Sequence, residues 1–232
     1  MAKVEPPGHT GEGRYPAHPG SRPSPGRRDT WRRHLILFVR LPRLGAGKKR
    51  LARDIGAVAA LRFERLMLAR SLRRLGRDRR WHLRLAVTPD RAARRWPGAF
   101  PQGAGDLGVR MRRALAACGP GPAVLVGSDI PGLTANHIAE AFALLGRHDV
   151  AFGPASDGGF WLVGCRHRAP DFGRVRWSSA HALADVLANM PKSLSVGLAA
   201  TLDDVDDGAA YRRLMRSRRL RGLAGGANAP HL

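Results

Sequence analysis

Four aspartates crowd one short acidic segment near the end of the chain. Residues 202–208 read Leu-Asp-Asp-Val-Asp-Asp-Gly, which places four of only 18 acidic residues within five positions of a protein whose net charge is +22. Carboxylates this close repel one another unless a cation or arginines compensate them. Their oxygens suit a hard divalent cation. The alternative is an arginine-neutralised loop leading into a helix over 209–215, capped by Asp207.

A second carboxylate stands alone after an apolar run. Residues 124–127 read Val-Leu-Val-Gly and are followed at once by Ser128, Asp129, Ile130 and Pro131. A continuous apolar run of this length is typical of a buried strand, and Pro131 cannot extend the hydrogen-bonded ladder. Asp129 is therefore expected just past the carboxyl end of a central strand, the edge at which open α/β sheets bind ligands. The alternative is an ordinary turn in which Asp129 accepts from nearby amides.

A basic, glycine-containing loop follows the first predicted strand, 35–39. The loop carries Gly45, Gly47, Lys48 and Arg50 and leads into a helix. Backbone amides and a helix start can face a phosphate, and lysine adds positive charge. The spacing is not that of a Walker P-loop. Phosphate binding and a solvated basic loop both remain open at this point.

Two further glycine-rich segments contain a carboxylate. Residues 102–108 carry Asp106, either in a substrate loop or as the N-cap of the next helix. In residues 153–159, Asp157 precedes Gly158 and Gly159 between two predicted strands. Such glycines permit a ligand to approach the backbone closely. Asp157 and Gly158 could equally form the turn of a hairpin.

The elements that must position these residues alternate between strand and helix. Apolar patterns predict strands at 35–39, 83–88, 124–127, 149–152, 160–163 and 194–198. Helices are predicted at 57–75, 135–145, 180–189 and 209–215, with Thr134 capping the second and Ser178 or Ser179 the third. This alternation favours an α/β fold with one mostly parallel sheet flanked by helices. The domain is expected to span 34–215, between a disordered basic leader, 1–33, and a basic, glycine-rich tail, 216–232.

The composition narrows the class of partner and the compartment. All but four of the 40 basic residues are arginines spread along the chain, which indicates a general compositional bias. Charge alone supports only non-specific phosphate binding, so nucleic acid is not expected as the main partner. Two cysteines do not form a disulfide framework, which favours a cytoplasmic protein. No apolar run reaches the roughly 18 residues of a membrane span, and the start lacks a secretory signal pattern.

Six short motifs occur in order over residues 35–214. They are Pro42-x-x-Gly45-x-x-Lys48-x-Arg50-Leu51, Asp106-Leu107-Gly108-x-Arg110-Met111, Gly127-Ser-Asp129-Ile-Pro131, Gly153-Pro-Ala-x-Asp157-Gly-Gly159, Trp177-Ser178 and Asp204-Val-Asp206. Together they resemble a bacterial family of selenodomain-associated, glycosyltransferase-like transferases. That family has the GT-A-like nucleotide-diphospho-sugar transferase fold and is related to the guanylyltransferases of cofactor synthesis.

The resemblance implies a role for each matching residue. It implies Mg²⁺ or Mn²⁺ binding by Asp129 and Asp206, and catalytic roles for Asp157, Lys48 and Arg50. Nucleotide or phosphate contacts are implied for Gly45, Gly47, Lys48, Arg50, Asp106 and Ser128, and an acceptor-facing position for Gly158, Gly159 and Trp177. The chain departs from the family pattern at Lys49, where a small hydroxylated residue is usual, and at Phe160, where tyrosine is frequent. The motif at Asp129 has one aspartate where glycosyltransferases of this fold carry Asp-x-Asp.

The resemblance implies a metal-dependent transferase with a nucleotide-activated substrate. The first hypothesis is glycosyl transfer from a nucleotide-sugar to an unidentified small-molecule acceptor. The second is nucleotidyl transfer from an NTP to a phosphorylated acceptor, with release of pyrophosphate. The third is a non-catalytic nucleotide- or nucleic-acid-binding protein.

Overall fold

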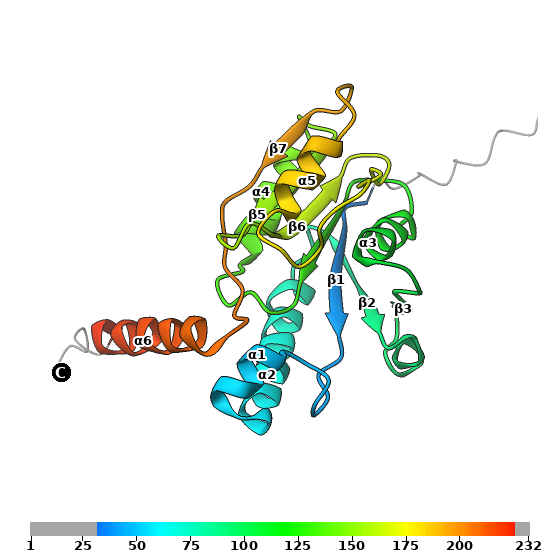
Figure 1. Cartoon of the computed structure of the whole chain (residues 1–232). Coiled ribbons are helices and arrows are strands. Elements are labelled where there is room, and N and C mark those ends of the chain that lie inside the picture. The colour runs from blue at the N-terminus through cyan, green and yellow to red at the C-terminus, as the bar shows by residue number, and fades with distance from the viewer. Residues whose placement is uncertain (1–31, 226–232) are drawn as a thin grey trace, which may run out of the picture. The chain divides into compact units, whose positions relative to one another are not determined.

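A seven-stranded sheet forms the centre of the computed structural model, which describes residues 32–225 (Figure 1). Across these residues the strand order is β3-β2-β1-β4-β6-β5-β7, so β4 is central. The strands are β1 (His34–Arg40), β2 (His82–Thr88), β3 (Ala99–Pro101), β4 (Ala123–Gly127), β5 (Val150–Pro154), β6 (Phe160–Cys165) and β7 (Val196–Leu198). All six predicted strands are present, and β3 is an addition.

The sheet is mostly parallel. Strands β3, β2, β1 and β4 pair in parallel with one another in that order, and β7 is parallel to β5. Strand β6 is antiparallel to both β4 and β5. The predicted fold class is therefore confirmed. The segment around Asp157 and Gly158 joins β5 and β6 as a hairpin, so the turn interpretation of that segment is also confirmed.

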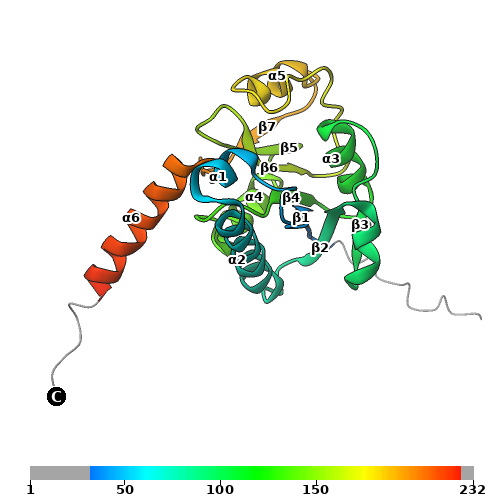
Figure 2. The ribbon, with the colours of Figure 1, turned by 60° about the horizontal axis from the view of Figure 1, so that its bottom comes forward.

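Helices cover both faces of the sheet, as Figure 2 shows. One face packs against α2 (Ala57–Gly76) and α4 (Ala135–Leu144), and its core includes Leu68, Leu75, Ile138 and Phe142. The other packs against α3 (Leu107–Ala116) and α5 (Ala182–Asn189), with Met111, Leu115 and Val186 in its core. A short 3₁₀ helix, η1 (Asp90–Arg95), follows β2. Strands β1 and β4 are buried on both faces of the sheet, which explains their continuous apolar sequences.

The helix caps agree with the sequence at three positions and differ at one. Asp106 accepts from Val109 N, Thr134 from His137 N, and Asp207 from Ala210 N. Helix α5, in contrast, begins at Ala182 after His181, and neither Ser178 nor Ser179 caps it. Residues 177–181 form turns instead, and the Ser179 hydroxyl donates to Arg176 O, which accounts for the later start.

A third, smaller core joins α1 (Lys49–Ile55), α2 and α6 (Gly208–Gly225). Leu51, Phe63 and Val205 are buried in it, and Tyr211 and Leu214 pack against them. Helix α6 continues past 215, into the segment that the sequence analysis assigned to a basic, glycine-rich tail. Arginine and leucine are good helix formers, and they dominate 212–221. Most of the predicted leader, 1–33, and the last seven residues of the tail lie outside the described residues.

Two smaller sequence expectations concern cysteines and membranes. Cys118 and Cys165 are both free thiols. Over residues 32–225, none of the helices is both long and apolar enough to cross a bilayer.

Candidate functional site

The central strand carries Asp129 to the edge of the sheet. Strand β4 ends at Gly127, and two residues later the carboxylate of Asp129 stands one-third exposed. Buried Ile130 and Leu133 anchor the turn that follows, and the Ser71 hydroxyl donates to Ser128 O from helix α2. The turn is therefore fixed on both sides of Asp129. This places the carboxylate at the carboxyl end of β4, as the sequence predicts.

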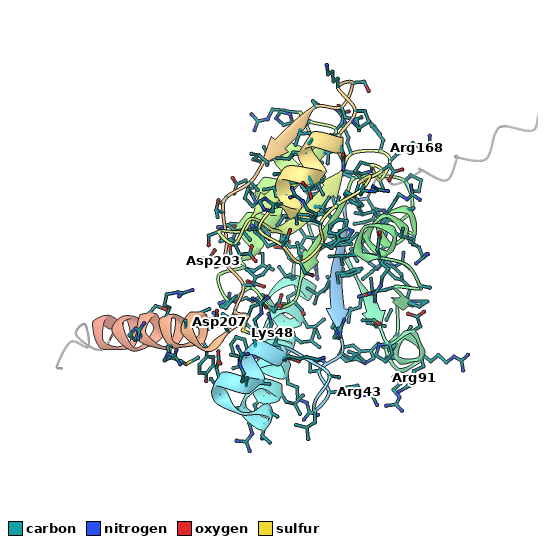
Figure 3. All side chains as sticks on the ribbon, in the orientation of Figure 1. Arg43, Lys48, Arg91, Arg168, Asp203 and Asp207 are labelled. Carbon is teal, nitrogen blue, oxygen red and sulfur yellow. The ribbon has the colours of Figure 1, made fainter. Side chains whose placement is uncertain are left out.

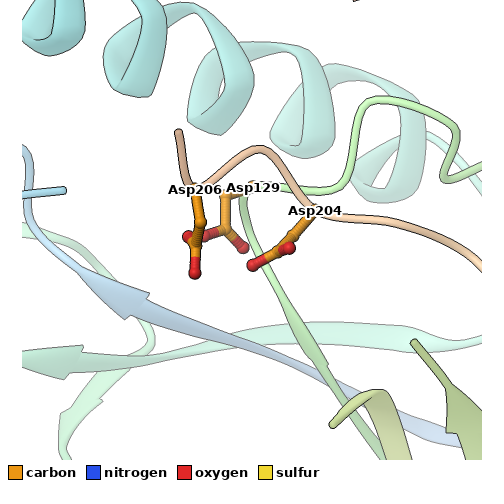
Figure 4. A group of neighbouring side chains, drawn as sticks. All are labelled: Asp129, Asp204 and Asp206. Carbon is orange, nitrogen blue, oxygen red and sulfur yellow. The ribbon is translucent and has the colours of Figure 1, made fainter. Parts of the chain in front are cut away.

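The acidic segment after β7 brings two more carboxylates to the same point. Val205 is buried in the third core, so its neighbours Asp204 and Asp206 both project away from that core. Carboxylate oxygens of Asp129, Asp204 and Asp206 all lie within 4.8 Å of one another (Figure 4). We refer to these three residues as the carboxylate trio. The other two aspartates of the segment do not join it, because Asp203 bonds Ser156 and Asp207 caps α6.

Lys48 inserts its ammonium group among the trio. Its Nζ lies 2.5 Å from Asp129 Oδ2 and 3.8 Å from Asp204 Oδ2, and it also pairs with Asp206 Oδ1. Only 12% of the Lys48 side chain is exposed. The loop before it is tied to helix α2, because Lys48 N donates to Glu64 Oε1 at 2.7 Å. A Cβ on Gly47 would lie 2.1 Å from that same oxygen, so a side chain at this position would have to displace the Glu64 carboxylate.

The charges of the trio are only partly compensated. Burial alone would lower the pKa of Lys48, but the charges of Asp129 and Asp206 outweigh it and raise that pKa. Burial, together with the charges of Asp206 and Asp129, raises the pKa of Asp204 to about 7. Burial opposes the shift at Asp206, yet the Lys48 charge prevails and lowers its pKa. The Lys48 ammonium therefore does not neutralise all three carboxylates.

The donor set of the trio fits a hard divalent cation. Three carboxylate oxygens from two segments converge within 4.8 Å, and Mg²⁺ and Mn²⁺ prefer such oxygens. The position they surround is held by the Lys48 ammonium, which stands in for a cation in these contacts. A metal ion and Nζ cannot both occupy it, because two positive charges would then share the same oxygens. A metal ion can therefore bind the trio only if Lys48 moves away from these carboxylates.

A cleft of about 550 Å³ opens beside the trio, within the usual size of a small-molecule pocket. The cleft is lined by Asp129, Asp204 and Asp206 at one end, and its apolar floor includes Phe38, Leu107, Met111 and Leu125. Trp177 forms part of the wall and makes edge contacts with Phe160 and Phe172 at centroid distances of 6.3 and 6.2 Å. The cleft thus joins an anionic end to an aromatic and aliphatic surface.

Half of the twelve predicted site residues line this cleft: Arg50, Asp129, Asp157, Gly159, Trp177 and Asp206. Arg50 lies on its rim, two-thirds exposed, with NH2 3.9 Å from Asp206. Asp157 and Gly159 line it, and Asp157 Oδ1 also accepts from Gly159 N. Gly158 is held behind them with φ +84°, and a Cβ there would lie 2.0 Å from Ala180 O. This glycine is needed for the hairpin to pack on the turn before α5.

Other predicted residues lie elsewhere. Asp106 caps α3 and does not line the cleft, and neither does Ser128. Gly45, at φ +76°, borders a separate space of only about 40 Å³ together with Gly47 and Lys48. Of this loop, Lys48 contacts all three carboxylates and Arg50 pairs with Asp206, whereas Gly45 and Gly47 do not line the cleft. Phosphate contacts of Gly45, Gly47, Asp106 and Ser128 stay predictions.

Two residues of the site were not singled out by the sequence. Asp204 was part of the acidic segment, but only Asp206 was assigned to a metal. The signal was available: an apolar residue between two aspartates places both carboxylates on one side of an extended segment. Glu64, which holds the Lys48 backbone, lies 16 residues away on a helix, and no local pattern indicates that contact.

The architecture and the cleft define an α/β protein of the GT-A-like nucleotide-sugar transferase type of fold. A crystal structure of a protein from Desulfovibrio desulfuricans G20, provisionally described as a nucleotide-diphospho-sugar transferase, superposes with a TM-score of 0.68 at 28% identity. The match covers 75% of this chain and 82% of that one. A 4-diphosphocytidyl-2C-methyl-D-erythritol synthase from Anaerococcus prevotii DSM 20548 superposes with a TM-score of 0.50 at 10% identity, covering 79% and 96%. The second likeness concerns the fold alone.

The comparison with protein-family models matches a shorter part of the chain than the structural comparison does. A family model described as "uncharacterized protein conserved in bacteria", DUF2064, matches residues 71–179. The matched range contains Asp129 and Asp157 but not Lys48, Asp204 or Asp206. Curated proteins yielded no match. The predicted relation to selenodomain-associated proteins stays a prediction.

Proposed function

We propose that this protein is a metal-dependent transferase that acts on a nucleotide-activated substrate. The observation that carries the proposal is the carboxylate trio with Lys48, placed at the carboxyl end of the central strand beside a 550 Å³ cleft. Ligands of open α/β sheets bind at this edge. The likeness to the Desulfovibrio desulfuricans protein, at 28% identity over 75% of the chain, supports a nucleotide-sugar as the activated substrate.

The chain's own residues have distinct roles in this proposal. Asp129, Asp204 and Asp206 would hold Mg²⁺ or Mn²⁺, which when bound stabilises the charge that develops on a leaving phosphate group. Lys48 and Arg50 neutralise phosphate oxygens at the same end of the cleft. Asp157 orients the acceptor hydroxyl or removes its proton, since its carboxylate lines the cleft. Trp177 and the apolar floor exclude water from the acceptor side.

Glycosyl transfer from a nucleotide-sugar is the first form of the proposal. The acceptor attacks the anomeric carbon, the bond from that carbon to the diphosphate breaks, and a nucleoside diphosphate leaves. The acceptor proton passes to Asp157. The acceptor is a small molecule that fits the aromatic and aliphatic part of the cleft.

Nucleotidyl transfer is the second candidate, and one sequence feature favours it. The position at the end of β4 carries Ser128 and Asp129 rather than Asp-x-Asp, which departs from the glycosyltransferase pattern. In this form a phosphorylated acceptor attacks the α-phosphate of an NTP, and pyrophosphate leaves. The two forms therefore differ in the product that carries the leaving phosphates.

A thermal-shift panel tests the proposal. NTPs and nucleotide-sugars are added one at a time, with Mg²⁺, with Mn²⁺ or with EDTA. A ligand at about 100 times its Kd stabilises the folded state by ~2.7 kcal/mol, which raises Tm by several degrees in a domain of this size. We expect a metal-dependent shift that is lost in Asp129→Asn and kept in Asp171→Asn, an exposed carboxylate away from the cleft.

Product analysis of the ligands that give a shift then separates the forms. Release of a nucleoside diphosphate supports glycosyl transfer, and release of pyrophosphate supports nucleotidyl transfer. Binding without either product, over a panel of hydroxyl and phosphate acceptors, would leave a non-catalytic nucleotide-binding protein. No shift with any nucleotide would contradict the proposal.

A further inference from the structure

A second concave surface lies at the same edge of the sheet and shares no lining residue with the cleft. It has a cavity volume of about 620 Å³. The segment after β1, helix α2 and η1 form its walls. We call it the arginine groove, because five arginines line it: Arg43, Arg65, Arg91, Arg94 and Arg95.

The floor of the arginine groove is apolar and firmly supported. Leu68 and Ala92 are buried in the core between the sheet and α2. Leu41, Leu72 and Trp96 pack against that core and are partly exposed toward the groove. Five apolar side chains from three segments therefore form a continuous surface beneath the arginines. A fixed floor of this kind distinguishes the groove from a set of arginines scattered over a solvated face.

The five arginines have no side-chain partner in the described part of the molecule. Among residues 32–217, whose side chains the structure describes, none of their guanidinium groups forms an ion pair or hydrogen bond, whereas arginines elsewhere, such as Arg80 and Arg176, are paired with aspartates. The two acidic residues next to groove arginines in the sequence are engaged elsewhere. Asp90 accepts from Gly103 N at 3.1 Å, and Glu64 accepts from Lys48 N at 2.7 Å. The groove therefore combines five unpaired cations with no lining carboxylate.

We propose that the arginine groove binds a soluble phosphate ester with an apolar body. Guanidinium groups form bidentate hydrogen bonds with phosphate oxygens. The groove holds five guanidinium groups, more than the single carboxylate of an organic acid could pair with, which favours a phosphate group as the ligand. The apolar floor would bind the apolar body of the ligand. Inorganic phosphate has no such body. A volume of about 620 Å³ suits one small molecule rather than a polymer or a bilayer surface.

The proposal does not depend on the transferase function. The groove and the cleft are connected through the segment from Arg43 to Lys48, and Figure 3 labels Arg43 and Arg91 on the groove side and Lys48 at the cleft. Because the two sites share no lining residue, ligand binding at the groove can be tested in the absence of metal and nucleotide.

The experiment titrates the full chain with octyl phosphate below its micelle concentration at 150 mM salt, with calorimetric detection. Inorganic phosphate and neutral octyl glucoside are the comparison ligands. We expect octyl phosphate to bind at least about tenfold more tightly than either, because each comparison ligand lacks one half of the recognition. Arg91→Glu combined with Arg94→Glu should weaken octyl phosphate binding at least about tenfold.

The matched control removes the same charge elsewhere. Arg79 and Arg147 are exposed, line neither concave surface and have no ion pair within the described residues. Arg79→Glu combined with Arg147→Glu should leave octyl phosphate binding unchanged. All four substitutions are at exposed positions, and circular dichroism with thermal melting verifies that both variants are folded.

Three outcomes would overturn the proposal. Equal affinity for octyl phosphate and inorganic phosphate would show that the apolar floor takes no part. Equal losses in the two double variants would show that only net charge matters. Binding to phosphatidylglycerol–phosphatidylcholine vesicles without binding to octyl phosphate would assign the groove to a membrane surface instead.

Discussion

The cleft and the arginine groove lie at the same edge of the sheet and have opposite electrostatic designs. The cleft gathers three carboxylates around the Lys48 ammonium, which compensates part of their charge from within the chain. The groove gathers five arginines, and the nearby acids Glu64 and Asp90 are bonded elsewhere. A site whose charges are paired within the chain must rearrange to take up a ligand. A site whose charges are unpaired is ready to bind one.

This difference shows how a chain with 36 arginines can have a carboxylate site that no arginine blocks. Arg50, which pairs with the trio, is two-thirds exposed and lies 3.9 Å from Asp206. The close contacts to the trio are made by a lysine, which carries a compact charge on a flexible stem. A lysine can change partners more easily than a guanidinium group bound in a bidentate pair. The rarity of lysine in this chain makes Lys48 at this position a specific feature.

The largest expected effect is a loss of transfer activity from a substitution in the cleft that leaves ligand binding at the groove unchanged. Asp129→Asn should lower the rate of transfer by ~10²–10³, the cost of removing a group that stabilises developing charge. Octyl phosphate binding at the groove should be unchanged. Steady-state rates on the donor that the panel identifies provide the measurement. A rate within twofold of that of Asp171→Asn would contradict the assignment of Asp129.

The second prediction concerns the supports of the two regions. The acidic segment of the cleft is anchored by Val205 in the third core, whereas the groove floor belongs to the large core. Leu51→Ala, at a fully buried position in the third core, should lower the free energy of unfolding by ~2–5 kcal/mol. Urea denaturation measures the change. Leu66→Ala, at a side chain that is 47% exposed, should change it by less than ~0.5 kcal/mol.

The third prediction tests the competition between Lys48 and a metal ion. Lys48→Met removes the positive charge that occupies the trio, so the affinity for Mn²⁺ should rise about tenfold even as transfer is lost. Electron paramagnetic resonance of free Mn²⁺ gives the affinity directly. Lys49→Met, one residue further along the same loop and exposed, provides the control. Weaker Mn²⁺ binding in Lys48→Met would mean that the lysine supports the metal site rather than competing with it.

The fourth prediction is a dependence of stability on pH in the metal-free protein. The pKa of Asp204 is raised from 3.8 to about 7 by burial and by Asp206 and Asp129, so the folded state holds its proton more tightly than the unfolded chain. The resulting stabilisation is complete below about pH 4 and is lost as the pH rises through about 7. Asp204→Asn should remove this slope. Melting curves from pH 4 to 8 in EDTA measure it, and an unchanged slope would contradict the account.

The sequence predicted what depends on local pattern. Apolar runs identified the strands, and Thr134 was predicted as a cap because it precedes a helical pattern. For Asp106 and Asp207 the cap was one of two alternatives, and both residues do cap a helix. The position of Asp129 followed from the end of one buried strand. The proximity of Asp129 and Asp206 followed only from the family resemblance, since no local rule relates residues 77 positions apart.

The contacts that give the site its chemistry lay beyond such patterns. Lys48 was expected to face phosphate, yet its ammonium pairs with Asp206, 158 residues away. That contact depends on where the third core fixes α1 and the acidic segment, which is a tertiary result. Helix α5 began later than predicted because Ser179 bonds Arg176 O instead of capping the helix. Local hydrogen bonds of serine compete with caps in a way that sequence spacing does not decide.

The most direct test of the central claim is a calorimetric titration with nucleoside diphosphates in Mn²⁺ and in EDTA, for the natural chain and for Asp129→Asn. We predict that one nucleoside diphosphate binds the natural chain in Mn²⁺, binds at least about tenfold more weakly in EDTA, and loses this metal dependence in Asp129→Asn. Equal binding under all these conditions would contradict a metal-assisted nucleotide site at the carboxylate trio.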